Sequence, residues 1–112
     1  MAAEKTELLK GTLDMLILQI LTAGSLHGYA IARRIEERTD DALAIEEGSL
    51  YPALYRMESK GWINSEWGQT EHHRRAKFYR LTKAGREHLA GQMAQWKSFV
   101  GAVGQVLEPE ST

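Results

Sequence analysis

The spacing of apolar residues divides the chain into helical segments and one pair of strands. Residues 8–23 predict a first helix that is apolar on nearly every side, so its own core and something further, such as a second copy of the chain, must bury it. Residues 26–38 predict a second helix, in which a narrow apolar stripe containing Ile31 and Ile35 adjoins a charged face. A very short strand or an extended connector is expected at residues 42–46.

The stretch 47–63 contains the predicted helix around which the other segments are arranged. Gly48 and Ser49 are expected at its N-cap and Pro52 in its first turn, where the missing N–H is not needed. Gly61 is expected just past its end, in the left-handed conformation. One apolar stripe faces inward, and the outward face carries tyrosine, serine and arginine. Such groups contact phosphates and base edges, although a solvated surface helix has the same pattern.

The segment after this helix changes its apolar period from 3.6 to 2, which predicts an antiparallel hairpin. Its strands are expected at residues 62–67 and 77–81, joined by a polar loop over 68–76. Between His72 and Arg80 the chain has four lysines or arginines and no acidic residue. A helix with a polar outer face followed by a basic hairpin is typical of a winged helix, whose helix enters the major groove and whose wing contacts the backbone or minor groove.

The last helix is predicted over residues 82–107, with Thr82 as its N-cap. Its apolar residues are spaced 4, 3, 4, 3 and 4 apart, which makes an uninterrupted heptad seam. A domain this small cannot cover so long a helix, so we expect a partner helix to do so; packing on the chain's own core is the alternative. Residues 108–112 are expected to form a disordered tail. The seam, and therefore the expected dimer interface, consists of Leu89, Met93, Trp96, Val100, Val103 and Leu107.

Composition sets limits on this picture. A chain of 112 residues with a net charge of −1 fits one domain, and any surface for nucleic acid must then be a local patch. The absence of cysteine excludes disulfides, thiolate metal sites and thiol nucleophiles. The first residues do not resemble a signal peptide and no apolar run is long enough to span a bilayer, so a cytoplasmic protein is expected.

The sequence contains no recognisable catalytic or metal-binding motif. The four histidines and the acidic residues follow no helical metal-binding spacing, and no serine stands in a nucleophile-elbow context. We therefore expect neither enzymatic activity nor a cofactor. Metal or pH sensing by the adjacent His72 and His73 stays open as a weak hypothesis. The more serious alternative is a winged helix that binds another protein, which the near-neutral net charge would allow.

Several motifs along the chain occur in a recognisable combination. They are Gly11-Thr12-Leu13, His27-Gly28-Tyr29, the stretch from Gly48 to Glu58, Lys60-Gly61-Trp62-Ile63, and Lys77-Phe78-Tyr79-Arg80-Leu81-Thr82-Lys83-Ala84-Gly85. With this combination, the chain resembles the PadR family of transcriptional regulators over nearly its whole length. The stretch from Gly48 to Glu58 is the most specific part, and the single C-terminal helix resembles that of the short members of the family.

The resemblance agrees with the fold that the pattern predicts, which is mainly α-helical with a small β-hairpin. It implies a winged helix-turn-helix DNA-binding domain over residues 8–81 and a C-terminal dimerisation helix over residues 82–107. It further implies a homodimer that binds a roughly palindromic operator in double-stranded DNA and represses transcription.

The expected DNA contacts come from the third helix and the wing. Within the family the start of that helix approaches DNA, and further positions are added because they share its polar face or lie in the basic wing. The set is Ser49, Tyr51, Tyr55, Arg56, His73, Arg74, Arg75 and Lys77. Whether His72 and His73 touch DNA or respond to pH or metal stays open.

A small-molecule effector is also implied by the resemblance. Some short members of the family bind flat aromatic compounds between paired tryptophans at the dimer interface, and Trp96 stands at the corresponding seam position. Two copies of Trp96, backed by Met15, Met93 and Phe99, would hold a planar ligand. The alternative is that Trp96 is an ordinary core residue of the seam.

Overall fold

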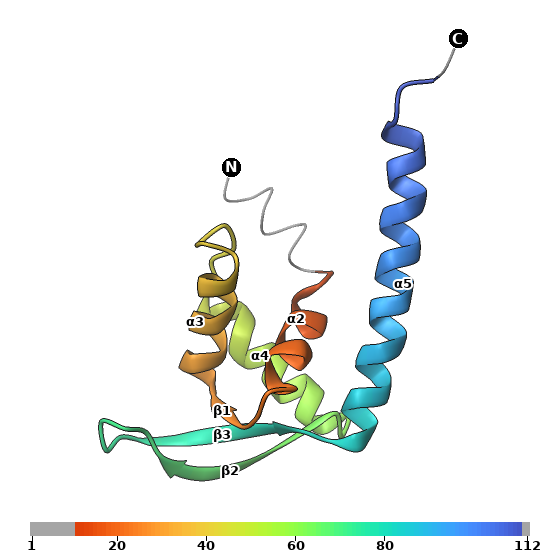
Figure 1. The fold of residues 1–112 in the computed structure, drawn as a ribbon. Coiled ribbons are helices and arrows are strands. Elements are labelled where there is room, and N and C mark those ends of the chain that lie inside the picture. Colours follow the sequence, from red (N-terminus) through yellow and green to blue (C-terminus); the bar gives the residue numbers. More distant parts are fainter. Residues whose placement is uncertain (1–10, 111–112) are drawn as a thin grey trace.

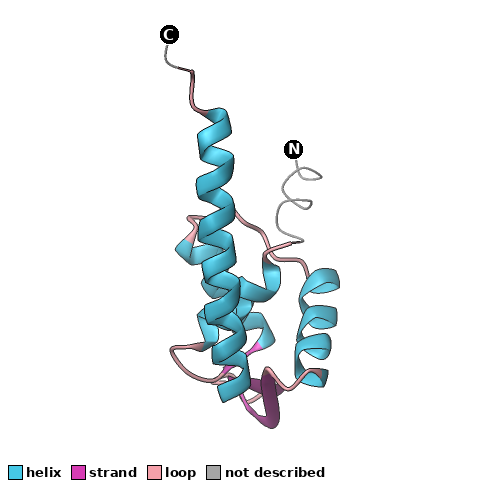
Figure 2. Cartoon of the chain, turned by 90° about the vertical axis from the view of Figure 1, so that its right-hand side faces the viewer, coloured by secondary structure: helices cyan, strands magenta, loops and turns pink. Residues whose placement is uncertain are grey.

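The computed structural model describes residues 11–110 and confirms the predicted fold class (Figures 1 and 2). The elements in chain order are α2 (Leu13–Leu21), β1 (Leu26–His27), α3 (Gly28–Arg38), α4 (Glu47–Ser59), β2 (Ile63–Gln69), β3 (Arg75–Leu81) and α5 (Lys83–Leu107). The strands form one antiparallel sheet in the order β1-β3-β2. Helices α2, α3 and α4 gather on one side of this sheet, and α5 projects away from them (Figure 1).

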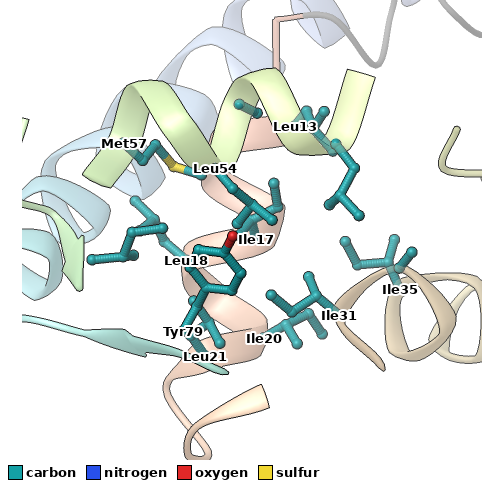
Figure 3. Close-up of a cluster of buried hydrophobic side chains, with 14 of the residues drawn as sticks. Leu13, Ile17, Leu18, Ile20, Leu21, Ile31, Ile35, Leu54, Met57 and Tyr79 are labelled. Carbon is teal, nitrogen blue, oxygen red and sulfur yellow. The ribbon is translucent and has the colours of Figure 1, made fainter. Parts of the chain in front are cut away.

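One apolar core joins the three short helices to the sheet (Figure 3). Leu18 of α2, Ile31 of α3 and Leu54 of α4 are fully buried at its centre. Tyr79 of β3 closes the core from below, and Leu89 attaches the first turns of α5 to it. Burying a side chain of this size stabilises the fold by roughly 1.5–3 kcal/mol. The core therefore determines how α4 is held relative to the sheet.

The first two helices are shorter than predicted. Of the expected helix over residues 8–23, residues 8–10 lie outside the described residues, and α2 ends at Leu21. The second helix begins only at Gly28, because the N–H of Ala30 donates a hydrogen bond to Nδ1 of His27, which makes His27 the N-cap. His27 and the residue before it pair with β3 instead, as strand β1. The segment 42–46 is a connector without strand structure.

The start of α4 was predicted wrongly and its end correctly. Glu46, not Gly48 or Ser49, is the N-cap, and the helix begins at Glu47. Pro52 therefore lies in the second turn, where it cannot donate to the carbonyl of Gly48; this carbonyl belongs to an exposed residue that water can reach.

The end of α4 is a Schellman motif. Gly61 has a φ of 78°, as predicted, and its N–H donates to the carbonyl of Glu58. The N–H of Trp62 donates to the carbonyl of Met57. This pair of hydrogen bonds turns the chain directly from α4 into β2, the first strand of the hairpin.

The hairpin of β2 and β3, residues 63–81, is called the wing below. Its strands are longer than predicted, because β2 extends to Gln69 and β3 begins at Arg75, which leaves a loop of only residues 70–74. Thr70 closes this loop: its hydroxyl accepts the N–H of Arg74 and its carbonyl accepts that of His73. Arg75 therefore belongs to a strand of defined register, not to a loop.

Helix α5 is attached to the base of the wing through Trp62. The Thr82 hydroxyl caps α5 by accepting the N–H of Gly85 at 3.0 Å, as predicted. The carbonyl of Trp62 accepts the N–H of Thr82 at 3.1 Å, and the Thr82 hydroxyl lies 2.6 Å from the carbonyl oxygen of Gly61 and 3.0 Å from that of Trp62. The backbone of Gly85 passes so close that a Cβ there would lie 2.0 Å from the Trp62 carbonyl oxygen. Only glycine fits at this joint.

Replacing Gly85 with alanine is expected to destabilise the fold, because the added methyl group would push the start of α5 away from Trp62. Overpacking of this kind costs about 1–3 kcal/mol or more. Gly91→Ala is the matched control: Gly91 lies in the same helix with nothing within 4 Å of a Cβ, so alanine should stabilise by about 1 kcal/mol. Chemical denaturation measures both, and equal stability of the two variants would contradict the close fit at Gly85.

Candidate nucleic-acid interface

The outward face of α4 carries three of the predicted contacts. Ser49 lies exposed in the first turn, Tyr51 is 44% exposed, and Tyr55 one turn later is 76% exposed. Leu50 and Leu54 on the opposite face are buried in the core. Their burial fixes the rotation of the helix, which leaves Ser49 and Tyr55 exposed and Tyr51 half exposed.

Arg56 does not join this group. Its guanidinium donates a hydrogen bond to the carboxylate of Asp14 on α2, with 2.5 Å between Nη2 and Oδ1. The polar face that the sequence suggested therefore separates into an outward group at the start of α4 and an ion pair toward α2. The DNA contact of Arg56 stays a prediction, and it requires this arginine to leave or share its carboxylate partner.

A hydrogen-bonded connector sets where α4 begins. The carboxylate of Glu36 accepts the N–H of Ile45 at 2.9 Å and a guanidinium N–H of Arg33 at 2.8 Å. The N–H of Ile45 first, and Arg33 second, hold the pKa of Glu36 below its ordinary value. Asp40 and Asp41 turn the chain with φ values of 49° and 63°, a conformation that aspartate tolerates better than most residues.

The wing brings its predicted cations together with a tryptophan that the sequence analysis missed. Arg74 and Arg75 form no ion pair with any residue between 11 and 110, whereas the ammonium of Lys77 lies 3.8 Å from the carboxylate of Glu58. The guanidinium of Arg75 lies 4.7 Å from the ring centroid of Trp67, and the Lys77 ammonium 5.9 Å from it. The alternation of the strand places Trp67 on the same face as the buried Ile63, and it indicates neither the exposure of Trp67 nor these cationic neighbours.

An open groove of about 890 Å³, called the wing groove below, separates the wing from the first turns of α3 and α4. Its opposing walls include Tyr29 and Tyr51 on the helices and Trp67, Arg74, Arg75 and Lys77 on the wing. The structure thus brings the start of α4 and the wing cations, which lie far apart in the sequence, to one surface.

Tyr51 reaches this groove because Gly28 makes room for it. A Cβ at Gly28 would lie 2.8 Å from Cε1 of Tyr51. Burial, with a smaller effect of the nearby Glu47 carboxylate, raises the pKa of Tyr51 above its ordinary value. Since a tyrosine already titrates near pH 10, the hydroxyl is protonated at neutral pH and can donate a hydrogen bond to an anionic oxygen.

The wing tip contains the two adjacent histidines. His73 adopts a φ of 60°, and His72 lies 3.9 Å from the carboxylate of Glu71. Within residues 11–110, no three histidine, cysteine, aspartate or glutamate side chains come together to hold a metal ion. The described part of one chain therefore does not by itself provide a metal site at this tip.

The seam of α5 divides into a covered and an uncovered part. Leu89 is buried and Met93 packs partly against the core. From Trp96, which is 45% exposed, the apolar side chains stand free of the described residues. They are Trp96, Phe99, Val100, Val103, Val106 and Leu107. Of the predicted effector residues, Met15 and Met93 therefore adjoin the core, while Trp96 and Phe99 face outward.

None of the helices within residues 11–110 has the length and apolarity that crossing a bilayer requires. This applies to α5 as well, although it is the longest of them and has much exposed apolar surface.

Comparisons with known proteins identify relatives of both sequence and fold. The family model of the PadR-like transcriptional regulators matches residues 17–91. A transcriptional regulator from Clostridium thermocellum is 28% identical, with a TM-score of 0.84 over 91% of this chain and 99% of its own. A PadR family transcriptional regulator from Eggerthella lenta is 35% identical, with a TM-score of 0.81 over 97% of this chain and 93% of its own. An uncharacterised protein from Lysinibacillus sphaericus is 29% identical over 82% of this chain and 84% of its own.

The hydrogen bonds of Glu36 predict a pH dependence of stability. Because folding lowers the pKa of this carboxyl, its stabilising effect is present above the ordinary pKa of glutamate, about 4.3, and is lost as the pH falls through the folded-state pKa. Glu36→Gln should lower the melting temperature at pH 7 and reduce its decline in acid. Glu37→Gln is the control, because Glu37 is exposed and lies 3.8 Å from Arg33. Identical melting profiles of the wild type and Glu36→Gln would contradict this role.

Proposed function

Because the chain belongs to the PadR-like family of transcriptional regulators, we propose that it binds a specific operator as a homodimer, represses transcription and is released by a small-molecule effector. The observation that carries the DNA-binding part is that Tyr51 of α4 and the wing cations Arg74, Arg75 and Lys77 line the same wing groove. A protein with a net charge of −1 gains little from general attraction to DNA. A local cationic surface is therefore what such binding requires.

In this proposal α4 enters the major groove and the wing contacts the backbone or the minor groove beside it. Ser49 and Tyr51 lie in the first turns of α4, where side chains and backbone N–H groups can reach base edges and phosphates. Arg74 and Arg75 are exposed and have no carboxylate partner within the described residues. Their charge is therefore fully available to phosphates, unlike that of Arg56.

The dimer part of the proposal rests on the uncovered half of α5. The large apolar side chains from Trp96 to Leu107 are between 38% and 83% exposed. Gly101 and Gly104 lower the intrinsic helicity of this half by about 1 kcal/mol each, so packing against a second helix would compensate for them. A two-fold axis along the seam would place two α4 helices about 34 Å apart, in successive major grooves.

The effector part of the proposal rests on Trp96. Its indole is half exposed on the seam, Phe99 lies nearly one turn further along α5, and Met93 lies one turn before it. Two such sets related by a dyad would form a pocket with flat aromatic walls and flexible methionines, which suits a planar ligand. A ligand between the two α5 helices would change the separation of the two α4 helices, and release from DNA would follow.

In the double variant Arg74→Ala/Arg75→Ala, the affinity for DNA should depend less steeply on salt concentration. The measurement is a gel-shift salt series with DNA from upstream of the coding region. The slope of log binding constant against log salt concentration should become shallower by about 2 to 4, since each lost phosphate contact removes about 0.9 and a dimer loses up to four contacts. Arg38→Ala is the control, because Arg38 is exposed at the far end of α3. Unchanged slopes in the double variant, or no binding by the wild type at low salt, would favour a protein-binding winged helix instead.

Planar aromatic drugs or phenolic compounds should quench the fluorescence of Trp96 saturably. The quenching should disappear in Trp96→Phe and persist in Trp62→Phe, because Trp62 stacks on His88 at the base of α5, away from the exposed seam. Titration of each variant measures the effect. If no compound of either class quenches saturably, the effector part of the proposal is wrong and the DNA-binding part is unaffected.

A further inference from the structure

The wing groove contains an aromatic residue to which the proposed DNA contacts assign no role. Trp67 lies on β2 directly opposite Lys77 of β3 and is 57% exposed. Trp67 belongs neither to the buried core nor to the partly buried residues packed against it. A large aromatic ring that remains exposed beside a groove is a candidate contact for a ligand.

The ring of Trp67 holds the wing cations without neutralising them. The guanidinium of Arg75 and the ammonium of Lys77 lie 4.7 Å and 5.9 Å from its centroid. A cation–π contact restrains a cation by the ring quadrupole, which carries no net charge. Arg33 and Arg56 are held by carboxylates instead, those of Glu36 and Asp14. Trp67 therefore keeps positive charge in place on the wall of the groove.

Two tyrosines from the helices supply further hydrogen-bonding groups to the groove. Tyr29 and Tyr51 line it from the first turns of α3 and α4. Around the groove, Arg74, Arg75 and Lys77 are opposed by the single carboxylate of Glu71 among the lining residues, and Lys77 shares its charge with Glu58. The groove is thus cationic, with apolar ring surface beside the cations.

We propose that this groove receives one sugar–phosphate strand of the bound DNA, with the indole of Trp67 packed on a deoxyribose and Arg75 and Lys77 bound to the flanking phosphates. Along such a strand apolar sugar surface lies beside charged phosphates. The wing offers a partner for each, because two cations lie within 6 Å of the centroid of one exposed ring. The strand is the one that separates the major groove, which α4 would enter, from the minor groove beside the wing. This inference rests on the proposed function, because it adds a residue and a binding mode to the same interface.

Binding to a 30-base-pair duplex from upstream of the coding region would test Trp67 directly. Trp67→Ala should weaken binding about tenfold at fixed salt, and the log–log salt slope should change by less than about 1, because the indole carries no charge. Trp67→Phe should lose less, since a smaller ring remains. Trp62→Phe, which alters a tryptophan outside the groove, is the matched control and should bind as the wild type does.

Tryptophan fluorescence distinguishes direct contact of Trp67 with DNA from a purely structural role of this residue, because only direct contact would make the duplex quench the emission of Trp67. The duplex should quench the emission of the wild type and of Trp96→Phe, and should quench that of Trp67→Phe much less. Circular dichroism and melting temperature of Trp67→Ala should equal those of the wild type, because the side chain is outside the core.

Two results would overturn the inference while leaving the proposed function intact. One is wild-type affinity in Trp67→Ala with unchanged quenching in Trp67→Phe, which would mean that the ring does not meet DNA. The other is a weakened Trp67→Ala whose salt slope falls as far as that of Arg75→Ala, which would mean that the ring only positions the cation. If the wild type itself fails to bind any duplex at low salt, the proposed function fails, and the inference fails with it.

Discussion

The joint between the wing and α5 is the constraint on which the arrangement depends. The N–H of Thr82 donates to the carbonyl of Trp62, and the Thr82 hydroxyl lies within hydrogen-bond distance of the carbonyls of both Gly61 and Trp62. The bare backbone of Gly85 packs against the Trp62 carbonyl. The end of α4, both wing strands and the start of α5 meet at this point (Figure 1). Whatever covers the free half of α5 is therefore coupled to the orientation of α4 and the wing by a contact with no room for adjustment.

The arginines of the wing differ from Arg33 and Arg56 in having no carboxylate partner among the described residues. Where an arginine has a structural task, the chain supplies a carboxylate: Arg33 pairs with Glu36 and Arg56 with Asp14. In the wing, Arg74 has no such partner within the described residues, and Arg75 lies against an indole. A protein of nearly neutral net charge thereby presents a local cationic surface, which is the condition that specific attraction to phosphates imposes.

The sequence predicted the features that depend on neighbouring residues in the chain. Gly61 ends α4 and Thr82 begins α5 as expected, because a left-handed C′ glycine and a hydroxyl N-cap each act on the backbone within a few residues. The fold class followed from the change of apolar period. The start of α4 was missed because Glu46 caps it through its backbone conformation, without a side-chain hydrogen bond.

The features missed in the site depend on partners distant in sequence. The wing strands extend beyond the apolar alternation because backbone pairing, not burial, continues them to Gln69 and Arg75. The ion pair of Arg56 joins positions 42 residues apart, and the cations around Trp67 come from the opposite strand. No spacing rule within one segment could have revealed these contacts.

The central claim is that two copies of this interface act on one DNA duplex through the α4 start and the wing. Hydroxyl-radical footprinting of the bound upstream DNA tests it most directly. The account predicts protected backbone patches arranged with two-fold symmetry, with centres separated by about one helical turn, 10 base pairs. A single patch without a symmetric counterpart, or uniform weak protection along the duplex, would contradict it.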